Sequence, residues 1–196
     1  MEIMDYANQI CEFLSHVPEI KNCSVVGSLS NGNSDEYSDI DIEIDVSGID
    51  NGKFLTKIPN ILAQKYHVIF ADYAPSLAPQ VYVVSIAVSA VNPFMVVDIR
   101  CVANPHMNTL SKEDISSLNN LYEHTLKLFT YNLKHFIRGK ECFNDIERMH
   151  NRILEKRENA DEHLMFSEVY NWLSDNATDK YIEYLRSLKK YLWNAV

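Results

Sequence analysis

Residues 38–46 read Ser-Asp-Ile-Asp-Ile-Glu-Ile-Asp-Val, with an acidic residue at every second position and an aliphatic residue between each pair. Successive side chains of a β-strand point to opposite faces of a sheet, so this alternation is typical of a strand and not of a helix. The aliphatic side predicts burial in a core, and the acidic side predicts exposure to solvent or to a ligand. We therefore expect a sheet with one face that carries carboxylates.

The acidic strand lies within a larger cluster of negative charge. Between positions 35 and 50 the sequence holds seven carboxylates and no Lys or Arg: Asp35, Glu36, Asp39, Asp41, Glu43, Asp45 and Asp50. The 196-residue chain as a whole has 27 acidic and 18 basic residues, which gives a net charge of −9. Lys and Arg supply most of the affinity of proteins for long nucleic acids, so this balance argues against a long nucleic acid as a partner.

The composition, 46% hydrophobic and 23% charged, is typical of a globular protein. No stretch approaches the apolar length of a transmembrane helix, and the first residues lack the basic region of a signal peptide, so we expect a cytoplasmic protein without membrane association. The cysteines are isolated and lack metal-binding spacing. We expect reduced core thiols, without a disulfide framework or a zinc site, at Cys11, Cys23, Cys101 and Cys142.

The chain divides into a predicted α+β domain, residues 1–104, and a predicted helical bundle, residues 105–196. In the first domain we expect a mixed sheet flanked by helices, with helices at 2–15 and 54–66 and strands at 23–26, 38–46, 67–71, 81–90 and 94–102. The last two strands are predicted to form a hairpin. The second domain is predicted to begin with one long helix, from a capping box at Ser111 and Asp114 to Gly139, followed by helices at 141–158, 162–174 and 179–193.

Asp39 and Asp41 are the acids best placed for chemistry. Carboxylates two positions apart on one strand face are about 6–7 Å apart at the backbone, close enough to converge on a pair of divalent ions. Oxygen ligands favour Mg²⁺ or Mn²⁺ over zinc. A third acid, Asp98, interrupts an apolar strand, where a buried carboxylate needs a partner. The alternative interpretation is an acidic strand face that is only solvated.

Gly27 and Ser28 follow the first predicted strand directly. A glycine at such a turn lets the backbone approach a phosphate closely, and a serine hydroxyl can donate a hydrogen bond to it. The sequence therefore places a candidate phosphate-binding turn upstream of the candidate metal ligands.

Gly27-Ser28, then Asp39-Ile40-Asp41, then Asp98 on a later strand resemble the GS…DxD…D signature of the DNA polymerase beta-like nucleotidyltransferase superfamily. The resemblance covers about residues 20–102. In layout it is closest to the aminoglycoside and lincosamide nucleotidyltransferases, in which a helical bundle follows the catalytic domain. The resemblance implies a nucleotidyltransferase fold and an enzyme of the EC 2.7.7 type. Such an enzyme would move a nucleoside monophosphate, with AMP from ATP expected, onto a hydroxyl and release pyrophosphate.

The resemblance also implies a role for each matching residue. Gly27 and Ser28 would hold the β and γ phosphates of a nucleoside triphosphate. Asp39 and Asp41 would ligate two Mg²⁺ ions, which Mn²⁺ can replace, and Asp98 would ligate the second ion. The proton of the attacking hydroxyl would pass to Asp98 or to a carboxylate of the helical domain. The helical candidates are Glu123, Glu141 and Asp145.

The expected acceptor is a small cationic hydroxyl compound, such as an aminoglycoside or lincosamide antibiotic. An acidic rim would attract a polycation and speed its capture; its members are Asp35, Glu36, Glu43, Asp45 and Asp50. Two of them, Glu43 and Asp45, depart from the family pattern, so each is either solvated or turned toward the substrate. Arg100 is expected to pair with an acid on its own strand face rather than with a phosphate.

The sequence leaves two other functions and the oligomeric state open. The first alternative is an antitoxin-type adenylyltransferase that modifies a partner protein, and the second is a non-catalytic module that binds nucleotide or metal. The last predicted helix fits a homodimer interface and simple core packing equally well. Its aromatic residues are Tyr181, Tyr184, Tyr191 and Trp193.

Overall fold

The computed structural model describes residues 3–89, 91–155 and 161–195, without the side chains of 193–195. These residues form two compact units. The first comprises residues 3–89 and 95–120, and the second comprises residues 91–94 and the described residues from 121 onward. This division differs from the predicted boundary at Asn104-Pro105, because Leu110 and Ile115 still pack into the core of the first unit.

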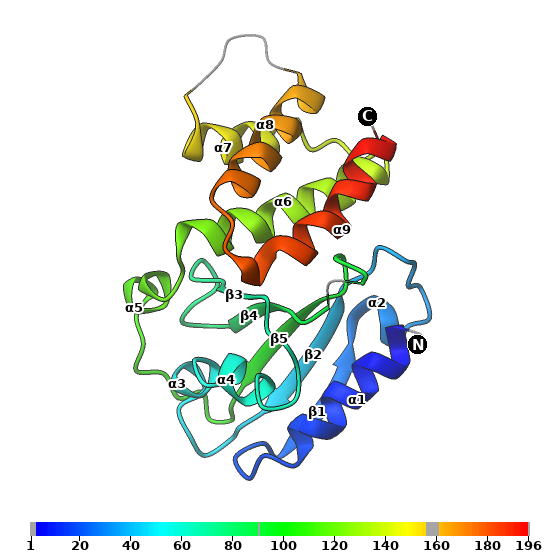
Figure 1. The fold of residues 1–196 in the computed structure, drawn as a ribbon. Coiled ribbons are helices and arrows are strands. Elements are labelled where there is room, and N and C mark those ends of the chain that lie inside the picture. Colours follow the sequence, from blue (N-terminus) through cyan, green and yellow to red (C-terminus); the bar gives the residue numbers. More distant parts are fainter. Residues whose placement is uncertain (1–2, 90, 156–160, 196) are drawn as a thin grey trace. The chain divides into compact units, whose positions relative to one another are not determined.

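The first unit is built on a five-stranded mixed sheet with the spatial order β1-β2-β5-β4-β3 (Figure 1). The strands are β1 (Asn22–Val26), β2 (Ile40–Asp45), β3 (Phe70–Tyr73), β4 (Tyr82–Ala87) and β5 (Val96–Val102). Strands β2 and β5 are parallel, and the other neighbouring pairs are antiparallel. The predicted α+β architecture, with a mixed sheet flanked by helices, is confirmed, as is the antiparallel pairing of β4 with β5.

One face of this sheet is buried under helices. The Ile side chains of β2 lie in one core with residues of α1 (Ile3–Ser15), α3 (Asn51–Leu55) and α4 (Ile58–Leu62). Those Ile residues are fully buried, whereas the acids that alternate with them are only partly buried. The alternation predicted from the sequence is therefore confirmed, and burial of the aliphatic side leaves the carboxylates on the opposite face.

Two predicted helices are each split in the structure. The helix expected at 54–66 is divided into α3 and α4, and Pro59 lies in the first turn of α4, where its missing N–H is tolerated. The long helix expected from Ser111 is divided into α5 (Lys112–Ser117) and α6 (Leu121–Ile137). The capping box of Ser111 and Asp114 is present, so the predicted start of this helix is confirmed.

Asn119 explains the break between α5 and α6. Its side-chain oxygen accepts a hydrogen bond of 2.8 Å from the backbone N–H of Tyr73, and its amide donates one of 2.9 Å to the backbone carbonyl of Tyr73. Tyr73 ends the edge strand β3. On the open edge of the sheet, the Asn119 side chain therefore makes the two backbone hydrogen bonds that a neighbouring strand would make. A continuous helix would draw Asn119 away from these two backbone groups.

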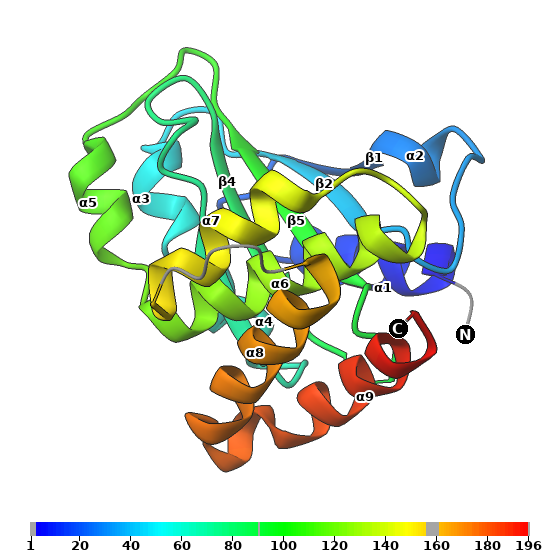
Figure 2. The same cartoon turned by 90° about the horizontal axis from the view of Figure 1, so that it is seen from above.

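The second unit contains the helices α6, α7 (Phe143–Ile153), α8 (Glu162–Asp175) and α9 (Asp179–Ala195), and α6 packs against the other three (Figure 2). These helices confirm the predicted elements with altered ends, and part of the break predicted around 159–161 lies outside the described residues. Gly139 has a φ of 66° and ends the α6 segment as expected. Among the described residues, no helix has the length and apolar character needed to span a membrane.

The tyrosines of α9 make packing and hydrogen-bond contacts inside the second unit. Tyr184 is buried, and its hydroxyl donates a hydrogen bond of 2.7 Å to the carbonyl of Pro93. The ring of Tyr191 lies 4.8 Å from that of Phe94, edge to face. Packing within the unit therefore accounts for these aromatic residues, and the side chain of Trp193 lies outside those described.

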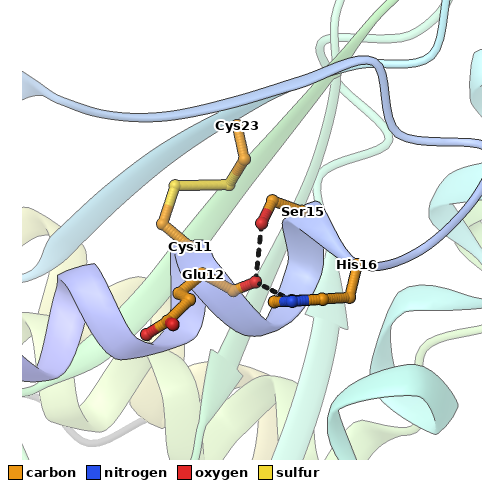
Figure 3. Close-up of a disulfide and its surroundings, with 5 residues drawn as sticks. All are labelled: Cys11, Glu12, Ser15, His16 and Cys23. Atoms are coloured by element: carbon orange, nitrogen blue, oxygen red, sulfur yellow. Dashed lines mark hydrogen bonds between the residues drawn. A yellow bond between two sulfur atoms is a disulfide. The ribbon is translucent and has the colours of Figure 1, made fainter.

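A disulfide between Cys11 and Cys23 corrects the expectation of four reduced thiols (Figure 3). It joins α1 to β1, with the two Cα atoms 5.7 Å apart. The helix packs beside the strand and brings together two cysteines that are 12 residues apart in the sequence, which spacing alone does not reveal. Cys101 and Cys142 are free and buried, as expected, and burial raises the pKa of the Cys101 thiol to about 12.

We predict that the double substitution Cys11→Ser/Cys23→Ser lowers the free energy of unfolding by about 3 kcal/mol, because the short loop is no longer closed in the unfolded chain. Urea denaturation followed by circular dichroism measures this. Wild-type protein treated with dithiothreitol should shift to the midpoint of the double variant, and dithiothreitol should leave the variant unchanged. Equal midpoints for the oxidised wild type and the variant would contradict the prediction.

Candidate active site

The parallel register of β2 and β5 places Asp41 directly beside Asp98. Residues paired on adjacent strands point to the same face, and neighbouring strands are about 4.8 Å apart. Both acids are partly buried and lie opposite the Ile core. Two carboxylates that are far apart in the sequence are therefore neighbours, as the predicted site requires.

Gly27 lies against Asp41. Val26, the last residue of β1, is paired with Asp41, and the chain turns at Gly27 with a φ of 72°. A Cβ atom at Gly27 would lie 2.9 Å from Cγ of Asp41 and even closer to Oδ2, so a side chain there would force the Asp41 carboxylate to move. The backbone of this turn therefore approaches the carboxylate closely.

Ser28 lies in the single-turn helix α2 (Gly27–Ser30), where the sequence predicted a turn. Its side chain is partly buried, and its carbonyl accepts a hydrogen bond of 3.0 Å from the N–H of Asn33. The structure thus brings Gly27 and Ser28 to the end of β1, next to Asp41.

Asp39 precedes the first residue of β2 and is partly buried. It follows the alternation of the strand and belongs to the same side of the sequence pattern as Asp41. In the part of the chain that the structure describes, no three His, Cys, Asp or Glu side chains are arranged to hold a metal ion. Asp41 and Asp98 on adjacent strands, and Asp39 just before β2, carry only oxygen atoms as potential ligands, and their side chains would have to turn toward one another to bind an ion.

Two polar residues that the sequence analysis missed extend the Asp41–Asp98 pair into a row across the sheet. Asp98 is paired with Ser85 on β4, and Ser85 is paired with Asp72 on β3. The row therefore reads Asp41, Asp98, Ser85, Asp72, with all four on one face. Asp72 is only 1% exposed and Ser85 only 3%. The sequence offered one signal for Asp72, because this residue directly follows the strand predicted at 67–71.

The expected acidic rim is largely engaged within the first unit. Arg100 lies 3.5 Å from the Glu43 carboxylate, which confirms that it pairs with an acid on its own strand face. Asp45 accepts hydrogen bonds from the side chain and backbone of Ser47, which lower the pKa of the Asp45 carboxyl below its usual range. Asp50 caps α3.

Distance along the strand also separates part of the rim from the site. Asp45 is four residues from Asp41, which corresponds to about 13 Å along a strand. Near the start of β2, Asp35 accepts a hydrogen bond of 2.9 Å from the hydroxyl of Ser38 and belongs to a turn. These acids also shape the strand and its connections, and their role in attracting an acceptor stays a prediction.

Of the three helical-domain acids considered as a base, two have partners within the second unit. Glu123 accepts hydrogen bonds of 2.9 Å from Lys180 and 2.6 Å from the Tyr181 hydroxyl. Asp145 lies 2.6 Å from the Arg148 guanidinium. Glu141 is exposed. Glu123 and Asp145 thus contribute to the helical unit itself.

Comparisons with known proteins give no family for this chain. No family model and no curated protein matches it. Among solved structures, it is similar to a chain of the GLD-2/RNP-8 complex, with 16% identity, a TM-score of 0.39 and coverage of 85% of this chain and 48% of the other. A chain from the polymerase core of TRAMP, an RNA surveillance complex, gives 13% identity, a TM-score of 0.42 and coverage of 96% and 56%.

A chain of the non-canonical poly(A) polymerase complex GLD-2–GLD-3 gives 18% identity, a TM-score of 0.38 and coverage of 90% of this chain and 53% of the other. The present chain thus spans about half the length of each solved chain named here.

We predict that Gly27→Ala destabilises the first unit by about 2–4 kcal/mol, because it combines a strained positive φ with a collision against Asp41. Gly32→Ala is the matched control. Gly32 has a φ of 70°, and a Cβ atom there would meet nothing within 4 Å, so only the cost of the backbone conformation, about 1–2 kcal/mol, is expected. Urea denaturation of both variants measures the difference. Equal losses would show that the approach of Gly27 to Asp41 contributes nothing.

Proposed function

We propose that this protein is a divalent-metal-dependent nucleotidyltransferase. The observation that carries the proposal is the row in which the Gly27 turn, Asp41 and Asp98 lie side by side, on three neighbouring strands or their ends. Phosphate-binding and metal-binding groups are both required next to one another for transfer of a nucleoside monophosphate. The adjacent positions of Gly27, Asp41 and Asp98 in the sheet support this proposal.

The residues fit a Mg²⁺ or Mn²⁺ site in their chemistry. Asp39, Asp41 and Asp98 offer only carboxylate oxygens, which are the donors that these ions prefer. The absence of a side chain at position 27 lets the backbone of this turn lie directly against the Asp41 carboxylate. When bound, a pair of such ions would stabilise negative charge on the attacking and departing oxygens.

The residues of the chain would bind the phosphates and accept the proton of the acceptor hydroxyl. The Gly27 backbone and the Ser28 hydroxyl bind the phosphates that depart as pyrophosphate. The acceptor oxygen forms its bond to the α-phosphorus as the bond to the bridging oxygen breaks. Asp98 then accepts the hydroxyl proton on its carboxylate and passes it to water. This role of Asp98 is supported by its position on the side of Asp41 that lies away from Gly27.

The acceptor in this proposal is a small molecule with a reactive hydroxyl. The structure gives less reason to expect an aminoglycoside, because Glu43, Asp45 and Asp50 are engaged locally. A panel of aminoglycosides, lincosamides, neutral polyols and a short RNA primer, each with Mg²⁺ and every α-labelled nucleoside triphosphate, tests the acceptor class. Labelled product with one class identifies it, and extension of the primer would replace the small-molecule acceptor with RNA.

We predict that Asp41→Asn and Asp98→Asn each reduce the rate of nucleotidyl transfer at least 100-fold, a loss of at least about 2.7 kcal/mol of transition-state stabilisation. The rate of pyrophosphate release in the presence of the active acceptor measures this. Glu43→Gln is the matched control, because Glu43 lies on the same strand face and pairs with Arg100, and its activity should stay within about threefold of the wild type. If wild type and Asp41→Asn bind nucleotide equally and neither turns over, the chain is a binding module and the proposal fails.

A further inference from the structure

Asp39 differs from the other two candidate ligands in how its backbone is held. Asp41 lies inside the sheet, paired with Val26 on one side and with Asp98 on the other. The pairing of β2 with β1 begins at Asp41, and its pairing with β5 begins at Ile40, so Asp39 precedes both ladders. The register of the sheet therefore fixes Asp41 and Asp98, whereas the position of Asp39 depends on the segment before the strand.

That segment ends in a hydrogen-bonded turn, residues 35–38. The Ser38 hydroxyl donates a hydrogen bond of 2.9 Å to Oδ1 of Asp35 and accepts one of 2.9 Å from the Asp35 backbone N–H. The Ser38 N–H donates one of 3.1 Å to the Asp35 carbonyl, and the Tyr37 N–H donates one of 3.0 Å to Oδ1 of Asp35. Four hydrogen bonds thus close a turn whose last residue is bonded covalently to Asp39.

Ser38 is the buried residue of this turn. It is only 4% exposed, whereas Asp35 is exposed. Burial of a hydroxyl costs free energy unless the hydroxyl is hydrogen-bonded, and here Asp35 serves it both as acceptor and as donor. Ile40, two residues further on, is fully buried in the core. Asp39 therefore lies between two anchored residues, which keep it on the side of the chain that carries Asp41.

The connection that leads to Asp39 is also held at its other end, near the phosphate turn. The Asn33 N–H donates a hydrogen bond of 3.0 Å to the carbonyl of Ser28, and the Gly32 N–H donates one of 3.2 Å to the carbonyl of Leu29. Both contacts tie the start of the connection to α2. The chain between the phosphate turn and Asp39 is thus fixed at both ends.

We infer that Asp35 and Ser38 are positioning residues for Asp39, and that their turn holds Asp39 in the position from which it binds a divalent ion together with Asp41. The inference rests on the proposed function, because it presupposes a metal site on this face of the sheet. Groups that orient a metal ligand without touching the ion typically change metal affinity about 10-fold or more when they are lost. Neither residue is a ligand here, and their effect passes through the backbone of Asp39.

Titration of the full chain with Mn²⁺, with the free ion followed by electron paramagnetic resonance, tests the inference without any turnover. We predict that Asp35→Ala and Ser38→Ala each weaken Mn²⁺ binding about 10-fold, because either change opens the turn. Asp35→Asn should weaken it no more than about twofold. The asparagine oxygen still accepts the hydrogen bonds from Ser38 and Tyr37, and only a charge screened by solvent is lost.

Ser47→Ala is the matched control, because Ser47 makes the same kind of turn at the opposite end of β2. Its hydroxyl and its N–H both donate hydrogen bonds to Oδ1 of Asp45. Asp45 lies about 13 Å along the strand from Asp41, so loss of this turn should leave the Mn²⁺ affinity unchanged. A loss of stability in Ser47→Ala without a loss of affinity separates positioning from general destabilisation.

Urea denaturation followed by circular dichroism shows whether each variant is folded and how much stability it has lost. Ser38 is buried, so its substitution carries the greater risk to folding. If Ser38→Ala does not fold, the comparison of Asp35→Ala with Asp35→Asn decides alone, because Asp35 is exposed and its replacement leaves no cavity in the core.

The outcomes distinguish the inference from the function on which it rests. If the wild type binds Mn²⁺ and Asp41→Asn abolishes binding, but Asp35→Ala and Ser38→Ala bind as the wild type does, the metal site stands and the positioning role is wrong. Equal losses in Asp35→Asn and Asp35→Ala would also overturn the inference, since the charge of Asp35 and not its turn would then be responsible. If the folded wild type does not bind Mn²⁺ at all, both the metal site and the positioning role are wrong.

Discussion

The parallel pairing of β2 with β5 is the interaction on which the rest of the first unit depends. Each strand presents aliphatic side chains to a core that is almost completely sealed from water, with Ile42 beside Ile99. A slip of one residue would turn every aliphatic side chain of the strand away from that core and every acid into it. Burial of the Ile face therefore fixes the register, and the register in turn fixes Asp41 beside Asp98.

The two edges of the sheet are tied down by different means. At β1, the disulfide joins Cys23 to Cys11 in the helix that packs beside the strand. At β3, the side chain of Asn119 bonds both backbone groups of Tyr73. Unpaired edge strands are weak points of a sheet, and these two attachments restrain strands that each have only one neighbour.

The acidic residues clustered between positions 35 and 50 have several separate roles in the fold. Asp50 caps a helix, Asp45 holds the turn after β2, and Glu43 is balanced by Arg100. These acids lie along β2 or beyond its end and contribute to local structure. Asp41 differs from them because it is followed across the sheet by Asp98 and, one strand further, by the Ser85–Asp72 pair. Of the acidic cluster in the sequence, Asp41 is thus the member that lies in this row across the sheet.

The sequence by itself determined the alternating strand, the turn at Gly27, the α+β class and the helical character of the second part, because these follow from local periodicity and from the conformational freedom of glycine. Three features were decided only by tertiary structure: the disulfide, the breaks that split two predicted helices, and the addition of Ser85 and Asp72 to the row. Cys11 meets Cys23, and Asn119 meets Tyr73, only after a helix or loop packs against a strand. Asp72 joins Asp98 only through the order of strands in the sheet, since strand order depends on contacts between residues far apart in the chain, which local patterns do not encode.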